Sequence, residues 1–431
     1  MVEITIKKGY KQTEIGVIPE DWDIVSFKKI ADKNKKWSIT GGPFGSNLKK
    51  SDYTNDGVQI IQLQNIGDGR FIDDYQIFTS KDKADELLSC NIYPNEIILS
   101  KMGDPVARAC FVPEKNERYL MASDGIRLVV NENEFSKKFI HDYINSAYFR
   151  NRAFEVSMGS TRLRIGLPKL KGLSVVKPPK EEQDLIATIL SDTDALINHL
   201  DKLITKKKAI KQGTIQQLLT GKKRLPGFSG EWEENKLVKI ADFFKGRGLS
   251  KSKIENNGQY SCILYGELFT TYARVIDEVK SKTNFTEGLT STEGDILMPG
   301  STTTVGIDLA VASVLNKNDV LIGGDVIVIR KKKQEFYNPN FLANYLTHVS
   351  KYKIAGITQG ITIIHLHGSR LQEIMVKIPK DVSEQTAIAT ILSDMDKEIE
   401  LIEHKRDKYI MLKNGMMQQL LTGAIRIYGN K

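Results

Sequence analysis

The heptapeptides IQQLLTG (residues 215–221) and MQQLLTG (residues 417–423) give the sequence the same ending twice. The heptapeptides are the ends of two longer repeated segments. Residues 182–221 align without a gap with residues 384–423 at an offset of 202, and 20 of 40 positions are identical. Self-similarity at a fixed offset marks an internally repeated architecture. Since this offset is the size of a domain, the repeat indicates a duplication.

Both copies predict a long helix. From Ile186 to Ile210 the apolar stripe of the first copy recurs in alternating steps of three and four, and apolar residues of the second copy recur on sevens. This spacing is typical of a coiled-coil seam. Each copy also ends at a glycine suited to a helix C-cap. We therefore expect residues 181–222 and 381–423 to form two helices that pair as an antiparallel coiled coil.

Two diverged segments share one layout around these helices. Each begins near a tryptophan, Trp22 or Trp232, with a short helical signal, and each ends on a strand and a proline, LSVVKPP or EIMVKIP. A repeated frame with two different domains indicates one mechanical task and two different recognition tasks. We predict a mixed α/β (α+β) fold divided into an N-terminal arm (1–15), a first domain (16–180), the first helix (181–222), a second domain (223–380), the second helix (381–423) and a tail (424–431).

The composition narrows the partners and the location. A net charge of +9 and a pI near 9.1 favour a polyanionic partner, of which nucleic acid is the commonest. No apolar run approaches the length of a membrane span, and the first residues do not resemble a signal peptide. Three cysteines at unrelated spacings predict neither disulfides nor a zinc site, so we expect a cytoplasmic protein without membrane contact.

The sequence lacks the motifs of common enzymes. We find no P-loop and no glycine-rich loop for S-adenosylmethionine, and the pair His365 and His367 has no third metal ligand nearby. NPNF (residues 338–341) resembles the Asn-Pro-Pro-aromatic motif of adenine methyltransferases. The equivalent place in the first half is SKKF (residues 136–139), which favours a helix start in both. We predict no catalytic residues, no metal and no cofactor in this chain.

Many residues suit DNA, although each is also explained by a solvated loop. Amides pair with adenine, arginines with guanine or phosphate, and hydroxyls with several partners. Our candidate DNA-binding residues are Lys49, Gln62, Gln64, Asn65, Lys101, Arg108, Ser160, Arg162, Arg164, Arg247, Tyr265, Tyr272, Ser301, Thr302, Thr303, Gln359 and Thr362.

Several motifs together resemble one family over essentially the whole chain. They are TEIGVIPEDW near the start, GGPFGSNLKKSDY, and QQLLTGKKRLPGFSGEW at the centre. These motifs resemble the specificity subunit of type I restriction-modification systems. The central motif is specific, because a helix end, a basic linker and Phe-Ser-Gly-Glu-Trp occur together.

The resemblance implies two target recognition domains, each of which reads one half of a bipartite, asymmetric site in double-stranded DNA. The helices would fix the spacer between the halves and dock two methylation subunits, and through these two restriction subunits. S-adenosylmethionine, ATP and magnesium would belong to those partners. Base-reading residues vary within the family, so none is carried over. Two alternatives remain open: a coiled-coil assembly scaffold without DNA contact, and an autonomous DNA methyltransferase.

Overall fold

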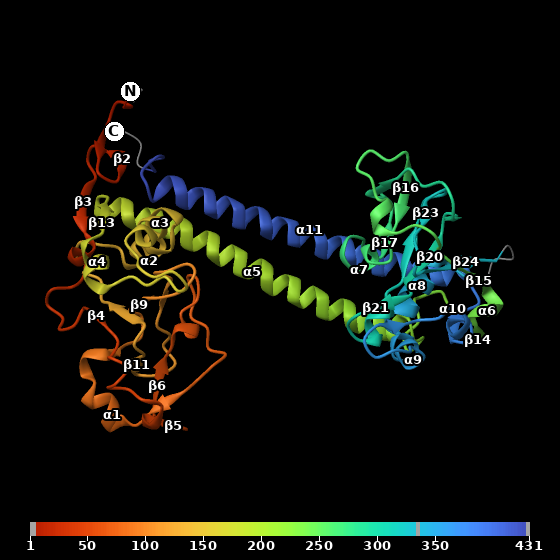
Figure 1. The fold of residues 1–431 in the computed structure, drawn as a ribbon, viewed down its shortest axis with the longest axis horizontal. Coiled ribbons are helices and arrows are strands. Elements are labelled where there is room, and N and C mark those ends of the chain that lie inside the picture. Colours follow the sequence, from red (N-terminus) through yellow and green to blue (C-terminus); the bar gives the residue numbers. More distant parts are fainter. Residues whose placement is uncertain (1–5, 333–336, 428–431) are drawn as a thin grey trace. The chain divides into compact units, whose positions relative to one another are not determined.

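The computed structural model describes residues 6–332 and 337–427 and separates the chain into two compact units. Unit 1 comprises Met1–Leu200 together with Lys405–Lys431, and unit 2 comprises Asp201–His404. Each long helix therefore contributes one part to unit 1 and the other part to unit 2 (Figure 1). Each unit therefore holds one of the two domains together with parts of both long helices.

Unit 1 contains two small sheets and two strand pairs. In the four-stranded sheet the order is β10 (Ala109–Phe111), β9 (Ile97–Ser100), β12 (Gly125–Leu128), β4 (Ile39–Gly41). In the five-stranded sheet it is β5 (Tyr53–Thr54), β7 (Phe78–Thr79), β6 (Val58–Ile61), β11 (Tyr119–Met121), β8 (Asn91–Ile92). The pairs are β1 (Tyr10–Thr13) with β2 (Gly16–Pro19), and β3 (Asp23–Ser26) with β13 (Ser174–Lys177).

Unit 2 repeats this plan with altered sheet edges. Its five-stranded sheet has the order β15 (Ala241–Lys245), β24 (Val326–Lys331), β20 (Asp295–Pro299), β22 (Ser313–Leu315), β17 (Val275–Ile276). Its four-stranded sheet has the order β18 (Ser281–Thr283), β16 (Tyr260–Ile263), β23 (Leu321–Ile322), β19 (Leu289–Thr290). The pairs are β14 (Trp232–Lys236) with β26 (Met375–Pro379), and β21 (Ser301–Thr302) with β25 (Ile364–His365).

Short helices join the strands, and two 39-residue helices dominate the rest. Those of unit 1 are η1 (Phe27–Ile30), η2 (Lys50–Asp52), η3 (Leu63–Asn65), α1 (Lys81–Glu86), η4 (Leu88–Cys90), α2 (Lys137–Asn145), α3 (Ala147–Glu155) and α4 (Leu167–Gly172). Those of unit 2 are α6 (Leu237–Ile240), η5 (Lys251–Lys253), α7 (Glu267–Thr270), η6 (Gly306–Leu309), α8 (Pro339–His348), α9 (Lys351–Gly356) and α10 (Gly368–Leu371). The long helices are α5 (Lys180–Leu218) and α11 (Val382–Leu420). Within residues 6–332 and 337–427, no helix combines the length and apolarity that a membrane span requires.

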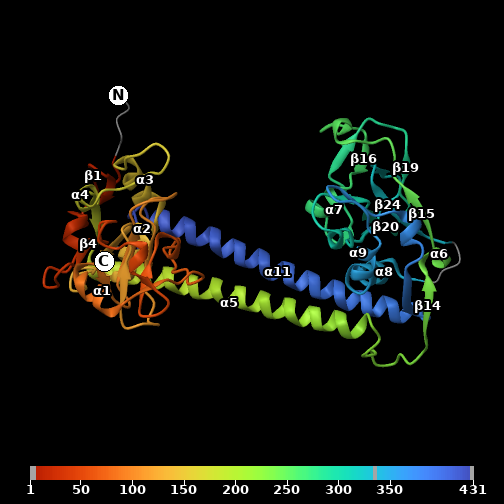
Figure 2. The same ribbon diagram turned by 60° about the horizontal axis from the view of Figure 1, so that its bottom comes forward.

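The long helices run antiparallel within each unit, as predicted (Figures 1 and 2). In unit 1, Lys413 of α11 pairs with Asp194 of α5 at 2.6 Å, and in unit 2, Lys211 of α5 pairs with Asp396 of α11. The predicted seam was wrong at Ile210, which is 46 % exposed. The helix has 3.6 residues per turn, so a seam that steps strictly by three and four drifts, and the buried positions after Leu200 shift to other residues.

The ends of both long helices lie in the cores of the units. In unit 1, Ile186 and Leu190 from the start of α5 cluster with Leu420 and Leu421 from the end of α11. In unit 2, the end of α5 and the start of α11 meet in the same way, for example through Leu219. The repeated IATILSD and QQLLTG motifs are therefore the two halves of one anchoring arrangement, which occurs once in each unit.

The strands that close each domain are confirmed, and so is the short helical turn predicted in each tryptophan segment, although a strand precedes it. Each tryptophan segment begins as a strand, β3 or β14, because it pairs with the closing strand β13 or β26. A helical turn follows only afterwards, as η1 or α6. The helix starts predicted for SKKF and NPNF are also present, as α2 and α8.

Candidate nucleic-acid interface

A glycine-turned hairpin occurs at equivalent places in both units. We name residues 158–164 hairpin 1 and residues 359–365 hairpin 2. The end residues exchange two backbone hydrogen bonds, of 2.9 and 3.0 Å in hairpin 1 and of 2.7 and 2.9 Å in hairpin 2. Gly159 and Gly360 have φ angles of +117° and +126°, and a Cβ there would lie 2.6 and 1.9 Å from a carbonyl oxygen across the turn. Glycine is therefore required in both turns, while the side chains that follow it are free to differ.

Each hairpin ends near an aspartate that directly precedes a strand, Asp124 before β12 or Asp325 before β24. In unit 1, Arg164 pairs with Asp124 at 3.1 Å. In unit 2, His365 lines the same cavity as Asp325, which pairs with Lys245 at 2.9 Å. Burial alone would raise the pKa of Asp325, but the hydrogen bond from Lys245 holds that pKa below its usual value. Hairpin 1 thus carries an exposed arginine where hairpin 2 carries a histidine.

Hairpin 1 borders a cavity of 810 Å³ in the first domain. Lys101, Arg164 and the exposed ring of Phe44 all line it. The Lys101 ammonium donates to the Ser123 carbonyl at 2.8 Å. Burial and the nearby Arg164 lower the pKa of Lys101. The cavity therefore combines two cations with an aromatic face, a set suited to the phosphates and bases of nucleic acid.

A second, smaller cavity of 220 Å³ also has Phe44 in its lining. Gln62, Tyr53 and Asp124 line it. The structure thus brings the predicted residues Gln62, Lys101 and Arg164 together around Phe44, which is 83 % exposed. Phe44 was not among the residues predicted from the sequence. The only sequence signal was an aromatic residue inside the glycine-rich run TGGPFGS.

Asn65 has a structural role and does not offer its amide to DNA. It is 1 % exposed, its amide nitrogen donates to the carbonyls of Ile72 and Tyr75, and its amide oxygen accepts from the Gln62 backbone. The adjacent Gln64 is exposed. Of the other candidates in unit 1, Lys49, Ser160 and Arg162 are exposed and Arg108 is half-buried.

The equivalent cavity in unit 2 has a volume of 580 Å³. It is lined by Tyr265, Phe269, Thr303, Ile363 and His365. Two further predicted residues line it but are largely buried. Their hydroxyls bond internally, that of Ser301 to Asp325 at 3.3 Å and that of Thr302 to Thr304 at 2.8 Å. Hairpin 2 therefore borders a cavity that is more apolar and less basic than its counterpart.

The remaining candidates of unit 2 divide into exposed and internal residues. Arg247, Gln359 and Thr362 are exposed. Tyr272 is half-buried, its hydroxyl accepts from the Lys280 backbone at 3.0 Å, and burial raises its pKa. Tyr272 is therefore engaged in holding its own loop.

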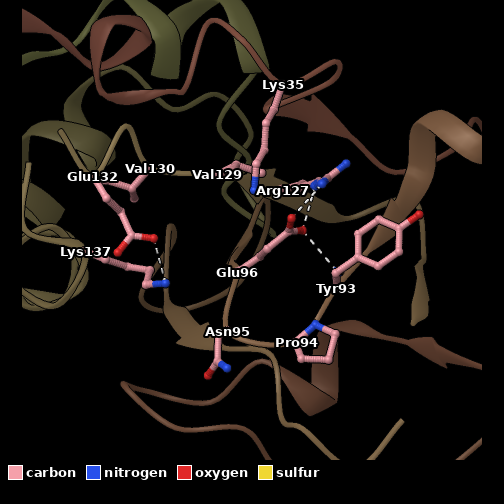
Figure 3. A pocket seen from close by; sticks show the side chains of 10 residues that line it. All are labelled: Lys35, Tyr93, Pro94, Asn95, Glu96, Arg127, Val129, Val130, Glu132 and Lys137. Atoms are coloured by element: carbon pink, nitrogen blue, oxygen red, sulfur yellow. Dashed lines mark hydrogen bonds and ion pairs between the residues drawn. The ribbon is translucent and has the colours of Figure 1, made fainter. Parts of the chain in front are cut away.

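A further cavity in unit 1, of 380 Å³, is lined by two ion pairs, Arg127 with Glu96 and Lys137 with Glu132 (Figure 3). Arg127 binds Glu96 through two hydrogen bonds of 2.6 and 2.7 Å, and Glu96 also accepts from the Tyr93 backbone. In unit 2, Arg330 binds Asp295 in the same two-pronged way. A two-pronged ion pair therefore connects the equivalent strands of both sheets, β12 with the start of β9 in unit 1 and β24 with β20 in unit 2, and we regard it as a part of the shared frame.

The geometry defines a class of protein in which one duplicated frame presents two different polar loop surfaces. The comparisons identify the family. The family model described as type I restriction modification DNA specificity domain matches residues 19–212 and again residues 229–409. The chain belongs to this family and carries its DNA specificity domain twice.

Relatives carry names from the same family, and solved structures share the fold. A Methanocaldococcus jannaschii protein named as the MjaX type I restriction enzyme specificity subunit is 24 % identical over 98 % of this chain and 97 % of its own length. The MjaVIII specificity subunit of the same organism is 25 % identical over 51 % of this chain and 50 % of its own. A crystal structure of the type I S subunit from M. genitalium has a TM-score of 0.55 at 17 % identity, covering 93 % of this chain and 96 % of that one. A structure from work on assembly and conformational transition of the type I R-M system has a TM-score of 0.58 at 13 % identity, covering 95 % and 99 %.

Proposed function

We propose that each unit of this DNA specificity subunit reads one half of a bipartite, asymmetric DNA site. The observation that carries the proposal is the pair of hairpins. Their backbones and their glycine turns are equivalent, whereas the side chains beyond the glycine differ in charge and polarity. A frame that is repeated while its exposed loops diverge suits two half-sites of different sequence.

In unit 1 we assign the DNA contact to the surface around Phe44. Arg162 and Arg164 would contact phosphate or guanine, and Gln62 would pair with a base edge. Lys101 lies deeper in the cavity and would contact the phosphate backbone of the DNA. In unit 2 the contact would be formed by Tyr265, Thr303 and the side chains of hairpin 2.

The helix pair would set the spacer and dock two methylation subunits, through which two restriction subunits join. Apolar side chains on α11 that are at least half exposed support a protein partner on the helices, because such a partner would bury them. Leu401 is 70 % exposed, Met411 is 69 % exposed and Leu412 is 52 % exposed. Because each unit holds one start and one end of a helix, two equivalent docking places would result.

We also propose that this chain does not catalyse. Methyl transfer from S-adenosylmethionine, and restriction driven by ATP and magnesium, would belong to the partner subunits. Purified chain should not label DNA from radioactive S-adenosylmethionine, whereas the complex with its methylation subunit should. Labelling by the chain alone would favour the autonomous methyltransferase instead.

The decisive experiment is to map methylated adenines by single-molecule sequencing in a host that expresses this chain with its methylation subunit. We expect one bipartite motif with two unlike halves. Exchange of residues 230–375 for those of a relative should change one half only. If the complex methylates nothing and shows no DNA shift in a gel, the scaffold without DNA contact becomes the better interpretation.

A further inference from the structure

Hairpin 2 presents an isoleucine that touches almost nothing in its own unit. Ile361, directly after the turn glycine, is 99 % exposed, and Ile363 is 49 % exposed. An exposed isoleucine side chain forgoes the stabilisation that burial of its apolar surface would contribute. Scattered apolar side chains are common on protein surfaces, so exposure alone does not define a site.

The comparison with hairpin 1 supplies a second observation. The bridges Met158 with Arg164 and Gln359 with His365 align the two turns residue by residue. Ser160 then stands where unit 2 has Ile361. At the position of Ile363, hairpin 1 has Arg162. At two places where unit 1 carries a polar or cationic side chain toward its proposed DNA contact, unit 2 carries a branched apolar one.

The surroundings of hairpin 2 are basic and aromatic. Arg370 lies at its base, with its guanidinium 3.5 Å from the Ile357 carbonyl. On the preceding helix α9, Tyr352 is 73 % exposed, and the Lys351 ammonium lies 5.3 Å from the centre of its ring. Lys351 and Arg370 therefore place positive charge beside the exposed apolar side chain of Ile361. This combination suits DNA, in which charged phosphates surround apolar base surfaces.

We infer that Ile361 packs against the apolar surface of the bases in the half-site that unit 2 reads. This inference rests on the proposed function and specifies how unit 2 performs it. The apolar surface is either the 5-methyl group of a thymine in the major groove or the face of a base at an opened step. Unit 1 binds its half through charge and hydrogen bonds, whereas unit 2 relies on an apolar contact.

The test uses the complex with the methylation subunit and a duplex that carries the methylation site mapped in the host. Ile361→Ser should weaken binding by at least about tenfold, because the burial of one isoleucine is lost. The slope of affinity against salt should stay unchanged, since no phosphate contact is removed. Arg162→Ser in hairpin 1 should instead reduce that slope by about 0.9. Val17→Ser removes an exposed apolar side chain of β2, far from either hairpin in sequence, and should leave binding unchanged.

Two further duplexes distinguish the sources of the apolar surface. Deoxyuridine in place of each thymine of the unit 2 half should abolish the difference between wild type and Ile361→Ser if a thymine methyl is the contact. 2-Aminopurine in that half should brighten on binding of wild type, but not of the variant, if a base step is opened. A silent result in both duplexes overturns the inference.

The inference and the proposed function fail in different ways. If the wild-type complex binds and methylates its site and Ile361→Ser does so equally well, only the inference is wrong. If Ile361→Ser loses the methylation subunit in gel filtration, Ile361 contacts protein and the inference is again overturned. If wild type shows no salt-dependent binding to any duplex, the proposed function itself is wrong.

Discussion

Units 1 and 2 hold their helix ends with the same kinds of side chain, although the chain is continuous at only one of the two places. In unit 2, residues 222–231 connect the end of α5 to Trp232. Within this connection Arg224 binds the buried carboxylate of Glu384 at 2.5 and 2.7 Å, and its guanidinium lies 5.9 Å from the centre of the Trp232 ring. The junction is therefore both covalent and ionic.

In unit 1 the equivalent contact joins opposite ends of the chain. Arg426 binds Glu182 at 2.7 and 2.8 Å and lies 6.0 Å from the centre of the Trp22 ring. It also binds Asp21 at 2.8 and 2.9 Å, and the Trp22 indole donates to Glu182 at 2.9 Å. Where no peptide segment connects the parts, additional polar contacts are present. Both copies thus retain the contact of an arginine with a buried glutamate and a tryptophan, whereas only unit 2 also has a peptide segment that connects these parts.

The largest expected effect comes from lengthening the helices that both units share. We would duplicate residues 201–204 of α5 together with residues 403–406 of α11. Four helical residues add about 6 Å and a net twist of about 40°. DNA advances about 3.4 Å and turns about 34° per base pair. The methylated site should keep both half-sequences while its spacer grows by one or two base pairs, as sequencing of methylated adenines would show.

The control is the same duplication in α5 alone. It would shift Lys211 relative to Asp396 while Asp194 still faces Lys413, so the register could not be satisfied in both units. We expect this variant to be inactive. An active double variant with an unchanged spacer would show that the helices do not measure the distance.

The next largest effect distinguishes the two junctions. Arg426→Ala and Arg224→Ala each leave a carboxylate unpaired that is only 2 % or 1 % exposed, at a cost of about 3 kcal/mol. In unit 2 the covalent connection through residues 222–231 keeps the end of α5 close to Trp232 at high effective concentration even without the ion pair. Arg426→Ala should therefore also release the chain end, which hydrogen exchange and protease trimming after Gly423 would report.

A conservative variant sharpens this comparison. Arg426→Lys retains the charge but cannot bind two carboxylates in a fork, so the stability of unit 1 in this variant should lie between those of wild type and Arg426→Ala. If Arg224→Ala opened its unit more than Arg426→Ala opens unit 1, the covalent connection would not be what distinguishes the junctions.

The sequence predicted the shared frame better than the surfaces mounted on it. The helices and closing strands could be found because both copies retain their motifs. Arg426 was missed, since the prediction ended the folded chain at Gly423, although Arg224 and Arg426 share the offset of the helix repeat. Asn65 and Phe44 could not be placed, because whether a loop side chain is buried or exposed depends on distant strands and not on neighbouring residues.

A smaller effect is expected from the arginines of hairpin 1. Arg162→Ala should weaken DNA binding and reduce the salt slope by about 0.9, as for the loss of one phosphate contact. Arg164→Ala also leaves Asp124 without its ion pair at the cavity, so it should lower affinity further. Methylation mapping should show a relaxed base preference in one half-site only. A change confined to the half that exchange of residues 230–375 also alters would contradict our assignment of unit 1.

The smallest effect is a pH dependence that belongs to unit 2 alone. His348, in the last turn of α8, lies with Nε2 2.8 Å from the Arg274 guanidinium. Arginine can only donate, so Nε2 accepts and must be unprotonated. Burial, followed by Arg274 and two lysines, lowers the pKa of His348 to about 3. Ser146, which caps helix α3 and cannot titrate, is the residue at the repeat offset in unit 1.

The sign of this dependence follows from the two protonation states. Below pH 6.5 the unfolded chain binds a proton at His348 while the folded unit does not, so stability falls from pH 6.5 toward pH 3 and is constant above. Because His348 is partly exposed, solvent screening keeps the slope below the roughly 1.4 kcal/mol per pH unit of full coupling. Hydrogen exchange corrected for its intrinsic rate should show unit 2 losing protection between pH 7 and pH 5 relative to unit 1. His348→Gln keeps an acceptor for Arg274 and removes the titration, so it should flatten that difference. Equal protection of unit 2 at both pH values in wild type would mean that His348 is free to accept a proton in the folded state.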